Sequence, residues 1–332
     1  MTQTAGPEIR QVKPSLITRP AKSSIRRFAA SFWMNYMFYS LAYAPWWVRA
    51  SKYVYFWFAM RFSKQLRHST LANAARILGP DSTHQQRFDL AKRTFSNIYD
   101  VIYDVGVCAH LSAAQIRQRV DAIEGHDNYV AARAAGRGVI VVSAHMGSFE
   151  TAVAALLDVE KRIHIVFKRD PASSQFERVR AVMRQRLGVV EHAIDDGWNM
   201  WVQLRDALLA NECVVLHADL VLPGQKGMKI PLLHGHILLP TGSVKLALAS
   251  GAPIIPAFCI RQPNGHVRLF AEPAIYPAES DGGTAAAHSI AAALEKFVRA
   301  YPDQWLNTRP IFCEDISADE LPLARSPSNA GK

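Results

Sequence analysis

One stretch of the chain brings together two side chains that can take part in proton transfer. His145 and Glu150 are separated by four residues within the segment GVIVVSAHMGSFE, which covers residues 138–150. An imidazole with an ordinary pKa of about 6.5 can accept a proton from a hydroxyl group, and a carboxylate on its other nitrogen would hold the required tautomer. We therefore expect His145 to act as a general base and Glu150 to orient it.

The residues around this pair predict the elements that position it. Val139–Val142 form a short β-branched run between a glycine and a serine, which is typical of a strand buried on both faces. Phe149 and Glu150 then open an apolar helical stretch that continues to Leu157. The pair would lie at the carboxyl end of a strand, where open α/β sheets place their ligand sites.

Strand and helix patterns alternate along the rest of the chain. Apolar runs predict strands at 163–167, 213–218 and 253–259, and amphipathic spacing predicts helices between them. Thr241 is expected to cap a helix that ends at Gly251. This order predicts an α/β fold, a two-layer or three-layer sandwich around a mostly parallel central sheet.

Composition and charge divide the chain into four predicted parts. Residues 1–25 lack periodicity and read as a mobile leader, residues 26–64 as membrane-associated helices, residues 65–315 as the catalytic domain, and residues 316–332 as a disordered tail. The net charge of +10 favours anionic partners. Four cysteines without a CxxC pair indicate reduced packing residues in a protein that faces the cytosol.

The segment 26–64 is rich in aromatic residues. No charged residue lies between Arg27 and Arg49, and nearly half of the aromatic residues lie between Phe28 and Phe62. Basic residues flank this segment on both sides, and its many Trp and Tyr residues favour helices that lie in the lipid headgroup layer. A spanning helix, or an aromatic helix packed on the domain, remains as an alternative. No module that binds nucleic acid is visible, so we expect a membrane surface as the partner.

The setting of His145-x-x-x-x-Glu150 resembles the His-x-x-x-x-Asp/Glu motif of the glycerolipid acyltransferases, and in particular the lipid A biosynthesis (late, lauroyl/myristoyl-type) acyltransferase branch. Further blocks in the same order strengthen the resemblance, which covers residues 85–310. These blocks are Ile165–Arg169, Val214–Asp219, Pro240–Phe258 and Tyr301–Leu306.

The resemblance implies roles for several residues beside the pair. Arg169 would stabilise charge or bind a phosphate, Asp219 would position the substrate or an arginine, and Lys226 and Lys229 would meet phosphate groups. Arg178, on the helix that follows Arg169, is a possible assistant. For most of the arginines on that helix, which include Arg180, Arg184 and Arg186, a solvated basic face is expected.

The resemblance also implies the reaction and the setting. A fatty acyl group would move from a thioester donor, acyl-acyl carrier protein or acyl-CoA, to a hydroxyl of a lipid A precursor at the cytoplasmic face of the inner membrane. An acidic carrier protein and a membrane lipid would be the partners, and no bound cofactor is expected. Ser148, Leu220 and Asn307 depart from the family pattern. An ornithine lipid, glycolipid or lysophospholipid acceptor, or a non-catalytic docking protein of the same fold, therefore stays open.

A metal site is the remaining alternative. His217, Asp219, His234 and His236 have spacings that metal ligands also use, which would suit a metallohydrolase. No complete metal motif such as HExxH is present, and abstraction of a proton from a hydroxyl needs no metal. We therefore expect no metal.

Overall fold

The structure is a computed structural model, and it describes residues 36, 39–40, 45–168, 174–221, 225–316 and 324–325. The predicted leader, the first part of the segment 26–64 and nearly all of the predicted tail lie outside these residues, as does Arg169. The prediction that Arg169 binds phosphate or stabilises charge therefore stays a prediction.

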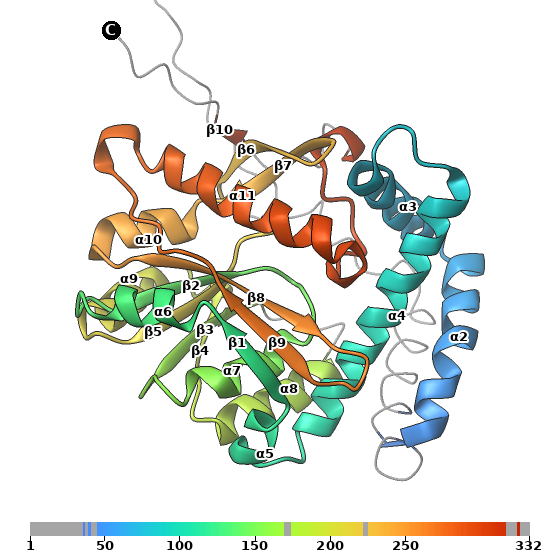
Figure 1. Cartoon of the computed structure of the whole chain (residues 1–332), viewed down its shortest axis with the longest axis horizontal. Coiled ribbons are helices and arrows are strands. Elements are labelled where there is room, and N and C mark those ends of the chain that lie inside the picture. The colour runs from blue at the N-terminus through green and yellow to red at the C-terminus, as the bar shows by residue number, and fades with distance from the viewer. Residues whose placement is uncertain are drawn as a thin grey trace, which may run out of the picture.

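A seven-stranded sheet with the order β1-β9-β8-β2-β5-β3-β4 forms the centre of the described part of the chain (Figure 1). Neighbouring strands are parallel except for β8 and β9, which form an antiparallel pair. The mostly parallel sheet predicted from the alternating pattern is thus confirmed. Its strands are β1 (Val120–Glu124), β2 (Val139–Ser143), β3 (Ile163–Phe167), β4 (Val190–Ala193), β5 (Cys213–His217), β8 (Ile254–Arg261) and β9 (Val267–Ala271).

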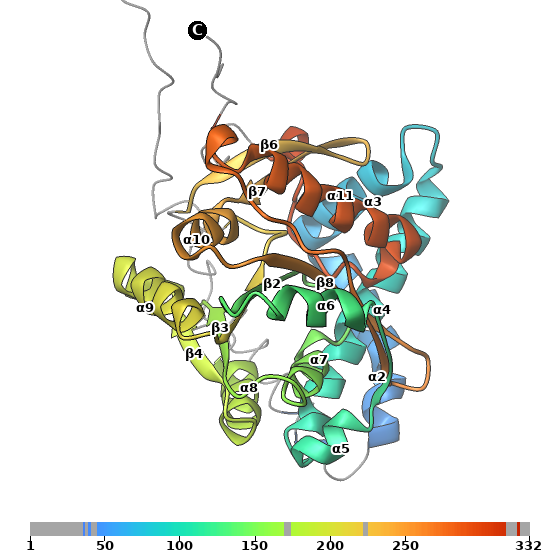
Figure 2. The ribbon, with the colours of Figure 1, turned by 60° about the vertical axis from the view of Figure 1, so that its left-hand side comes forward.

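Helices cover both faces of the sheet, so the sandwich has three layers. On β2, Ile140 and Val142 pack with α9, α10 and α11, whereas Val141 points to the opposite face. Figure 2 shows α10 and α11 on one side of the sheet and α7 and α8 on the other. The helices are α6 (His126–Arg133), α7 (Phe149–Leu156), α8 (Ser174–Arg186), α9 (Trp198–Leu209), α10 (Gly242–Ser250) and α11 (Thr284–Ala300), with the short α5 (Ala113–Arg117) beside α7.

A second, three-stranded sheet extends the core beyond α11. It consists of β6 (Gly227–Leu232), β7 (Gly235–Pro240) and β10 (Ala324–Arg325). Apolar side chains of β6 and β7, such as Ile230 and Leu239, belong to the same buried cluster as residues of α11. This sheet carries the chain from the end of β5 to the start of α10.

Three N-terminal helices lie beside the sandwich (Figure 1). They are α2 (Pro45–Phe62), α3 (Lys64–Leu78) and α4 (His84–Cys108). A capping box of Thr83 and Gln86 begins α4. One side of α2 is buried against α4, and none of the helices in the described ranges is long and apolar enough to cross a membrane.

The four cysteines are buried and free, as the sequence predicts. Cys108, Cys213, Cys259 and Cys313 lie in different parts of the core. Burial raises the pKa of each thiol, and that of Cys213 lies at about 12. These groups remain neutral thiols at physiological pH and act as small packing residues.

Candidate active site

The loop between β2 and α7 carries His145 and is tightly constrained. Gly147 has a φ of +56°, and a Cβ at this position would lie 2.1 Å from the carbonyl oxygen of Cys259 on β8. Only glycine fits here without displacement of the backbone. From the other side, Gly147 N donates to Gln304 O (3.1 Å) and Leu306 N donates to His145 O (2.8 Å). The sheet and the C-terminal segment together fix the backbone on which His145 stands.

The carboxylate that contacts His145 belongs to Asp219, which follows β5. Its Oδ1 lies 2.9 Å from His145 Nδ1. Its Oδ2 accepts hydrogen bonds from the backbone N of His145 (3.0 Å), Trp305 Nε1 (2.9 Å) and Asn307 Nδ2 (3.1 Å). Four donors therefore hold this buried carboxylate in one orientation.

The charges of this pair set the tautomer of the imidazole. Burial alone would raise the pKa of Asp219, but His145 and the hydrogen bonds outweigh it and hold this pKa well below its usual range. Burial alone would lower the pKa of His145, but the Asp219 carboxylate outweighs it and keeps this pKa above the ordinary 6.5. Because Asp219 is ionised, Nδ1 of His145 carries the proton, and Nε2 is left as the basic nitrogen.

Glu150 makes no hydrogen bond to His145, whose Nδ1 faces Asp219, so the prediction that Glu150 orients the imidazole is wrong. Its carboxylate accepts hydrogen bonds from Arg180 Nε (2.6 Å) and from Arg184 Nε (3.1 Å) and Nη2 (2.5 Å). Burial would raise the pKa of Glu150, but the two guanidinium groups outweigh it and lower the pKa to about 2. The first turn of α7 directs Glu150 toward α8, and the attraction of two arginines keeps it there.

The two arginines of α8 are the site residues that sequence reasoning missed. The side chain of Arg184 is only 2% exposed and that of Arg180 only 14%, whereas Arg178 is exposed. Arg180 also pairs with Glu177, and Arg184 with Glu191. The signal was present in the sequence, because residues 180 and 184 share one face of a helix four residues apart. A solvated basic face was the wrong reading for these two residues.

A second imidazole lies directly beside the first. The ring of His217, at the end of β5, stacks on that of His145 with 4.3 Å between centroids, and Phe149 packs edge-on against His217. Burial and the neighbouring His145 lower the pKa of His217 to about 3, so its ring is neutral. Its Nδ1 is buried and has no hydrogen-bond partner within the described ranges.

The four residues that were considered as metal ligands do not all lie together. His217 and Asp219 lie with His145, and one ligand atom of each lies within 4.8 Å of the others. A metal ion bound here would compete with the His145–Asp219 hydrogen bond. His236 instead pairs with Glu314, and the ring of His234 lies against Gly79.

The two predicted lysines lie on the small sheet. Lys226 and Lys229 are both exposed, directly before and within β6, and neither lines the pocket that contains His145. Lys168 and Gln225, each one position before a predicted site residue, do line that pocket. The roles given to Lys226 and Lys229 therefore have no geometric support in the pocket.

Two pockets meet at this site. A pocket in which charged and polar side chains share the wall with apolar ones, called the polar pocket below, contains His145, Lys168, Arg180 and the start of α10. An apolar cavity of about 210 Å³ lies between the sheet and α7. His217 and Arg184 line both, so the two spaces adjoin beside the imidazole pair.

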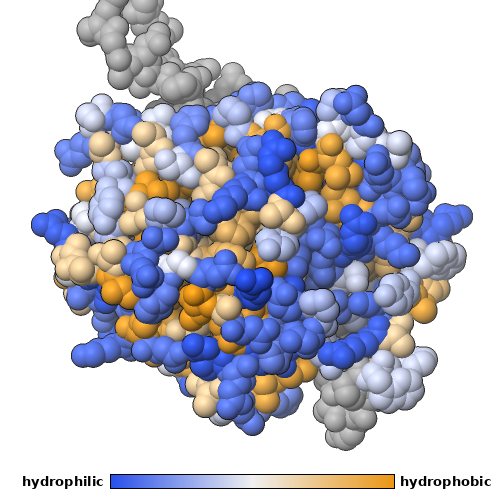
Figure 3. Space-filling view, in the orientation of Figure 1, coloured by the Kyte–Doolittle hydropathy of each residue, from blue (hydrophilic) through white to orange (hydrophobic). Residues whose placement is uncertain are grey.

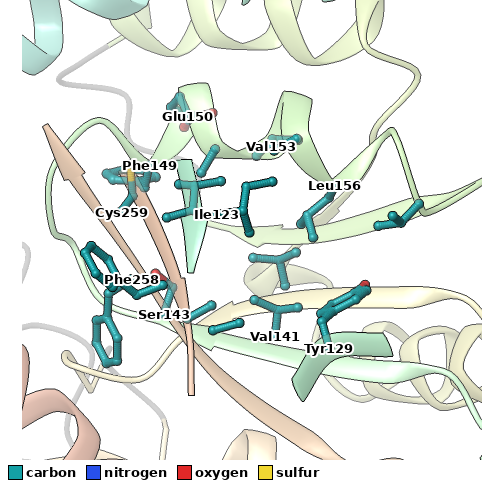
Figure 4. Close-up of a pocket in the computed structure, with 18 of the residues that line it drawn as sticks. Ile123, Tyr129, Val141, Ser143, Phe149, Glu150, Val153, Leu156, Phe258 and Cys259 are labelled. Carbon is teal, nitrogen blue, oxygen red and sulfur yellow. The ribbon is translucent and has the colours of Figure 1, made fainter. Parts of the chain in front are cut away.

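Apolar side chains line the cavity almost throughout (Figure 4). Val153 and Leu156 of α7 face Val141 of β2, and Tyr129 lies at the end that is far from Glu150. On the outside, Figure 3 shows hydrophobic residues gathered near the middle of one face, between hydrophilic residues. A hydrocarbon chain would fit the chemistry of this cavity.

Comparison with known proteins gives the family of the chain. The sequence profile of the bacterial lipid A biosynthesis acyltransferases matches residues 22–312. The chain belongs to this family. It is also similar to the phosphatidylinositol mannoside acyltransferase of Mycobacterium tuberculosis, in strains H37Rv and CDC 1551, with 24% identity over 262 residues. The matched region covers 76% of this chain and 79% of each relative. Membership identifies the chain as an enzyme that transfers acyl groups.

The three residues that depart from the family pattern lie at or beside the site. Ser148 Oγ donates to the buried Asp104 (2.6 Å), which also binds Arg261. Asn307 donates to Asp219, and Leu220 lines the polar pocket. These departures therefore affect the support of the His145 loop and the wall of the pocket.

Proposed function

We propose that the protein moves a fatty acyl group from an acyl thioester to a hydroxyl of a membrane lipid at the cytoplasmic face of the inner membrane. The observation that carries the proposal is the His145–Asp219 pair at the junction of a polar pocket and an apolar cavity. The family supplies the acyl transfer. Donor and acceptor are the proposed part.

The pair can carry out both proton transfers of such a reaction. Nε2 of His145 takes the proton of the acceptor hydroxyl as its oxygen attacks the thioester carbonyl, and Asp219 stabilises the resulting imidazolium. The tetrahedral intermediate then breaks its carbon–sulfur bond. The imidazolium gives its proton to the departing thiolate, so an ester and a free thiol are formed.

The neighbouring groups suit the remaining requirements of the step. Arg180 lines the same pocket as His145 and can stabilise the negative charge that develops on the carbonyl oxygen. The Glu150 carboxylate holds Arg180 and Arg184 in place. We therefore assign Glu150 as a positioning residue for this cationic pair.

The apolar cavity suits the hydrocarbon part of the donor. It begins beside His217 and runs under α7, so an acyl chain within it would place its carbonyl end near the imidazole pair. For the donor we propose acyl-acyl carrier protein or acyl-CoA. The net charge of +10 favours an acidic carrier protein over a neutral one.

The acceptor has two candidates. A lipid A precursor follows from the family description. A mannosylated glycolipid follows from the relative whose name states phosphatidylinositol mannoside as its substrate class. Both present sugar hydroxyls, which the proposed base can activate.

The outer side of α2 supports the membrane location. Trp46, Trp57 and Phe62 are 70%, 57% and 63% exposed, and Arg49 and Arg61 lie among them. Exposed aromatic rings beside basic side chains suit the headgroup layer of an anionic membrane. Phe58, the neighbour of Trp57, is 51% exposed as well. We expect the double variant W57S/F58S to bind anionic vesicles more weakly, while Trp198→Ser, whose 80% exposed ring lies at the start of α9, binds as the wild type does. Equal binding of all three proteins would contradict the location on α2.

The reaction can be tested with detergent-solubilised wild type and His145→Ala. Each protein is incubated with acyl-acyl carrier protein or acyl-CoA and a panel of lipid acceptors, and products are identified by mass spectrometry. We expect an acylated lipid that depends on His145. A product that forms equally with the variant would refute the role of His145, and release of free fatty acid that a chelator stops would favour a metallohydrolase.

A further inference from the structure

The start of α10 forms part of the wall of the polar pocket that also contains the imidazole pair. Gly242 and Ser243, the first residues of this helix, line the pocket together with His145 and Lys168. The ring of Trp201 covers Gly242 so closely that a Cβ there would lie 2.5 Å from the ring. Only glycine allows the first turn of α10 and the indole to share this wall.

The backbone N–H groups at the start of α10 have no side-chain cap. Thr241 occupies the N-cap position, as the sequence predicts, but its hydroxyl makes no capping bond. The hydroxyl instead donates to the carbonyl oxygen of Lys226 (3.2 Å). The first N–H groups of a helix have no partner within the helix, and they carry its partial positive charge. Two of the residues that carry these groups, Gly242 and Ser243, line the pocket.

Ser243 adds a polar side chain without a partner. The residue is only 4% exposed, and its Oγ has no hydrogen-bond partner within the described ranges. A buried hydroxyl without a partner costs free energy, so such a group is uncommon in native proteins. Ser243 lines the pocket, so a ligand that reaches its hydroxyl would provide the missing partner.

The pocket also holds a cation that no described carboxylate neutralises. Lys168 makes no ion pair with any described residue, whereas Arg180 is paired with both Glu150 and Glu177. The charge of Lys168 and the positive end of α10 therefore act on the same space. Together they favour an anion that accepts several hydrogen bonds.

We propose that Ser243, the first N–H groups of α10 and Lys168 form a binding site for a phosphate group in the polar pocket. A phosphate accepts hydrogen bonds from the hydroxyl and the N–H groups while Lys168 balances its charge. The site deepens the proposed function and rests on it only for the molecule that carries the phosphate. That molecule is either the thioester donor, through its pantetheine phosphate, or the lipid acceptor, through its headgroup.

Binding of inorganic phosphate tests the site without any acyl transfer. The full chain in detergent is titrated with phosphate and followed by ³¹P NMR, for the wild type, Ser243→Ala and Lys168→Ala. Ser250→Ala is the matched control, because this buried hydroxyl at the other end of α10 donates to Leu246 O (2.7 Å). We expect each site variant to bind phosphate about tenfold more weakly, since a hydrogen bond to a charged group contributes at least that factor.

The outcomes separate a ligand site from a merely structural hydroxyl. Without a ligand role, Ser243→Ala removes an unpartnered polar atom and leaves phosphate binding unchanged or raises the melting temperature. Unchanged binding in Ser243→Ala, or failure of the wild type to bind millimolar phosphate, overturns the proposal. Weaker binding in the site variants and unchanged binding in Ser250→Ala support it, even if no acylated lipid is found.

Steady-state kinetics then identify the source of the phosphate. Acyl-CoA is compared with an acyl N-acetylcysteamine thioester, which lacks phosphate, and a phosphorylated acceptor is compared with its dephosphorylated form. If the donor carries the phosphate, Ser243→Ala raises KM about tenfold for acyl-CoA and leaves KM for the short thioester unchanged. If the acceptor carries it, KM rises only for the phosphorylated acceptor. If Ser243→Ala changes KM equally for both substrates of each pair, no substrate phosphate binds at this site.

Discussion

Replacement of Asp219 by asparagine should remove the base while the fold is kept. In the wild type three donors converge on Oδ2, from His145 N, Trp305 Nε1 and Asn307 Nδ2, whereas one lies at Oδ1. An amide that keeps the three-donor side must place its oxygen there and its NH₂ group against His145 Nδ1. That NH₂ group can only donate, so Nδ1 must become the acceptor and the proton moves to Nε2.

The expected loss follows from this reversed tautomer. An imidazole that carries its proton on Nε2 cannot accept one from the hydroxyl, and the loss of the carboxylate removes the charge that stabilises the imidazolium. We expect kcat to fall about 10³- to 10⁴-fold, equivalent to about 4–5.5 kcal/mol in the activation free energy. The melting temperature should change little, because three of the four hydrogen bonds of residue 219 keep their direction.

The assay is acyl transfer at saturating donor for the wild type, Asp219→Asn and the control Asp303→Asn. Asp303 lies on the same C-terminal segment, but its carboxylate pairs with Arg93 at the surface. We expect the control to stay within about twofold of the wild type, as surface pairs contribute little. Activity of Asp219→Asn within tenfold of the wild type, in a folded protein, would refute the reasoning.

Three further predictions concern the groups around the pair. Glu150→Gln should lower the free energy of unfolding at neutral pH by about 3 kcal/mol, measured by denaturant titration, because it leaves the buried Arg184 with less counter-charge. This difference between the wild type and the variant should become smaller as the pH falls toward about 2, the pKa of Glu150 in the folded wild type, because Glu150 loses its charge there. The acid limb of the kcat/KM profile should have its midpoint above pH 6.5, because the neutral form of His145 is active and Asp219 raises its pKa; a midpoint below 6.5 would contradict the assignment. Val153→Phe should fill the apolar cavity and shift the preference toward shorter acyl thioesters, measured by competition between donors; an unchanged preference would place the acyl chain elsewhere.

The sequence predicts the sheet well because the relevant signals are local. The apolar run Val139–Val142 and the strand patterns after it indicate buried parallel strands, and the structure confirms them. The presence of helices on both faces was left open, because periodicity shows which face of a helix is apolar but not which side of the sheet it covers. The packing of α9 to α11 on one face of the sheet and of α6 to α8 on the other decides for three layers.

The site was predictable in its elements and less so in its contacts. His145 and Asp219 both follow strands that turn out to be neighbours in the sheet, and this adjacency brings them together. Sequence distance favoured Glu150 as the partner, because it lies five residues away. The direction of a side chain on the first turn of a helix depends on what packs beside that turn, here the arginines of α8.

The contact of the C-terminal segment with the His145 loop determines the order in which the site can be completed. Every strand of the main sheet precedes Gln304 in the chain, whereas two of the four donors to Asp219 come from Trp305 and Asn307. A nascent chain can therefore assemble the sheet and bring His145 next to Asp219 before the carboxylate has its final partners. Catalytic competence would then be acquired only once Trp305 and Asn307 have been synthesised, and a premature stop before Trp305 would yield a folded sheet without a rigid pair.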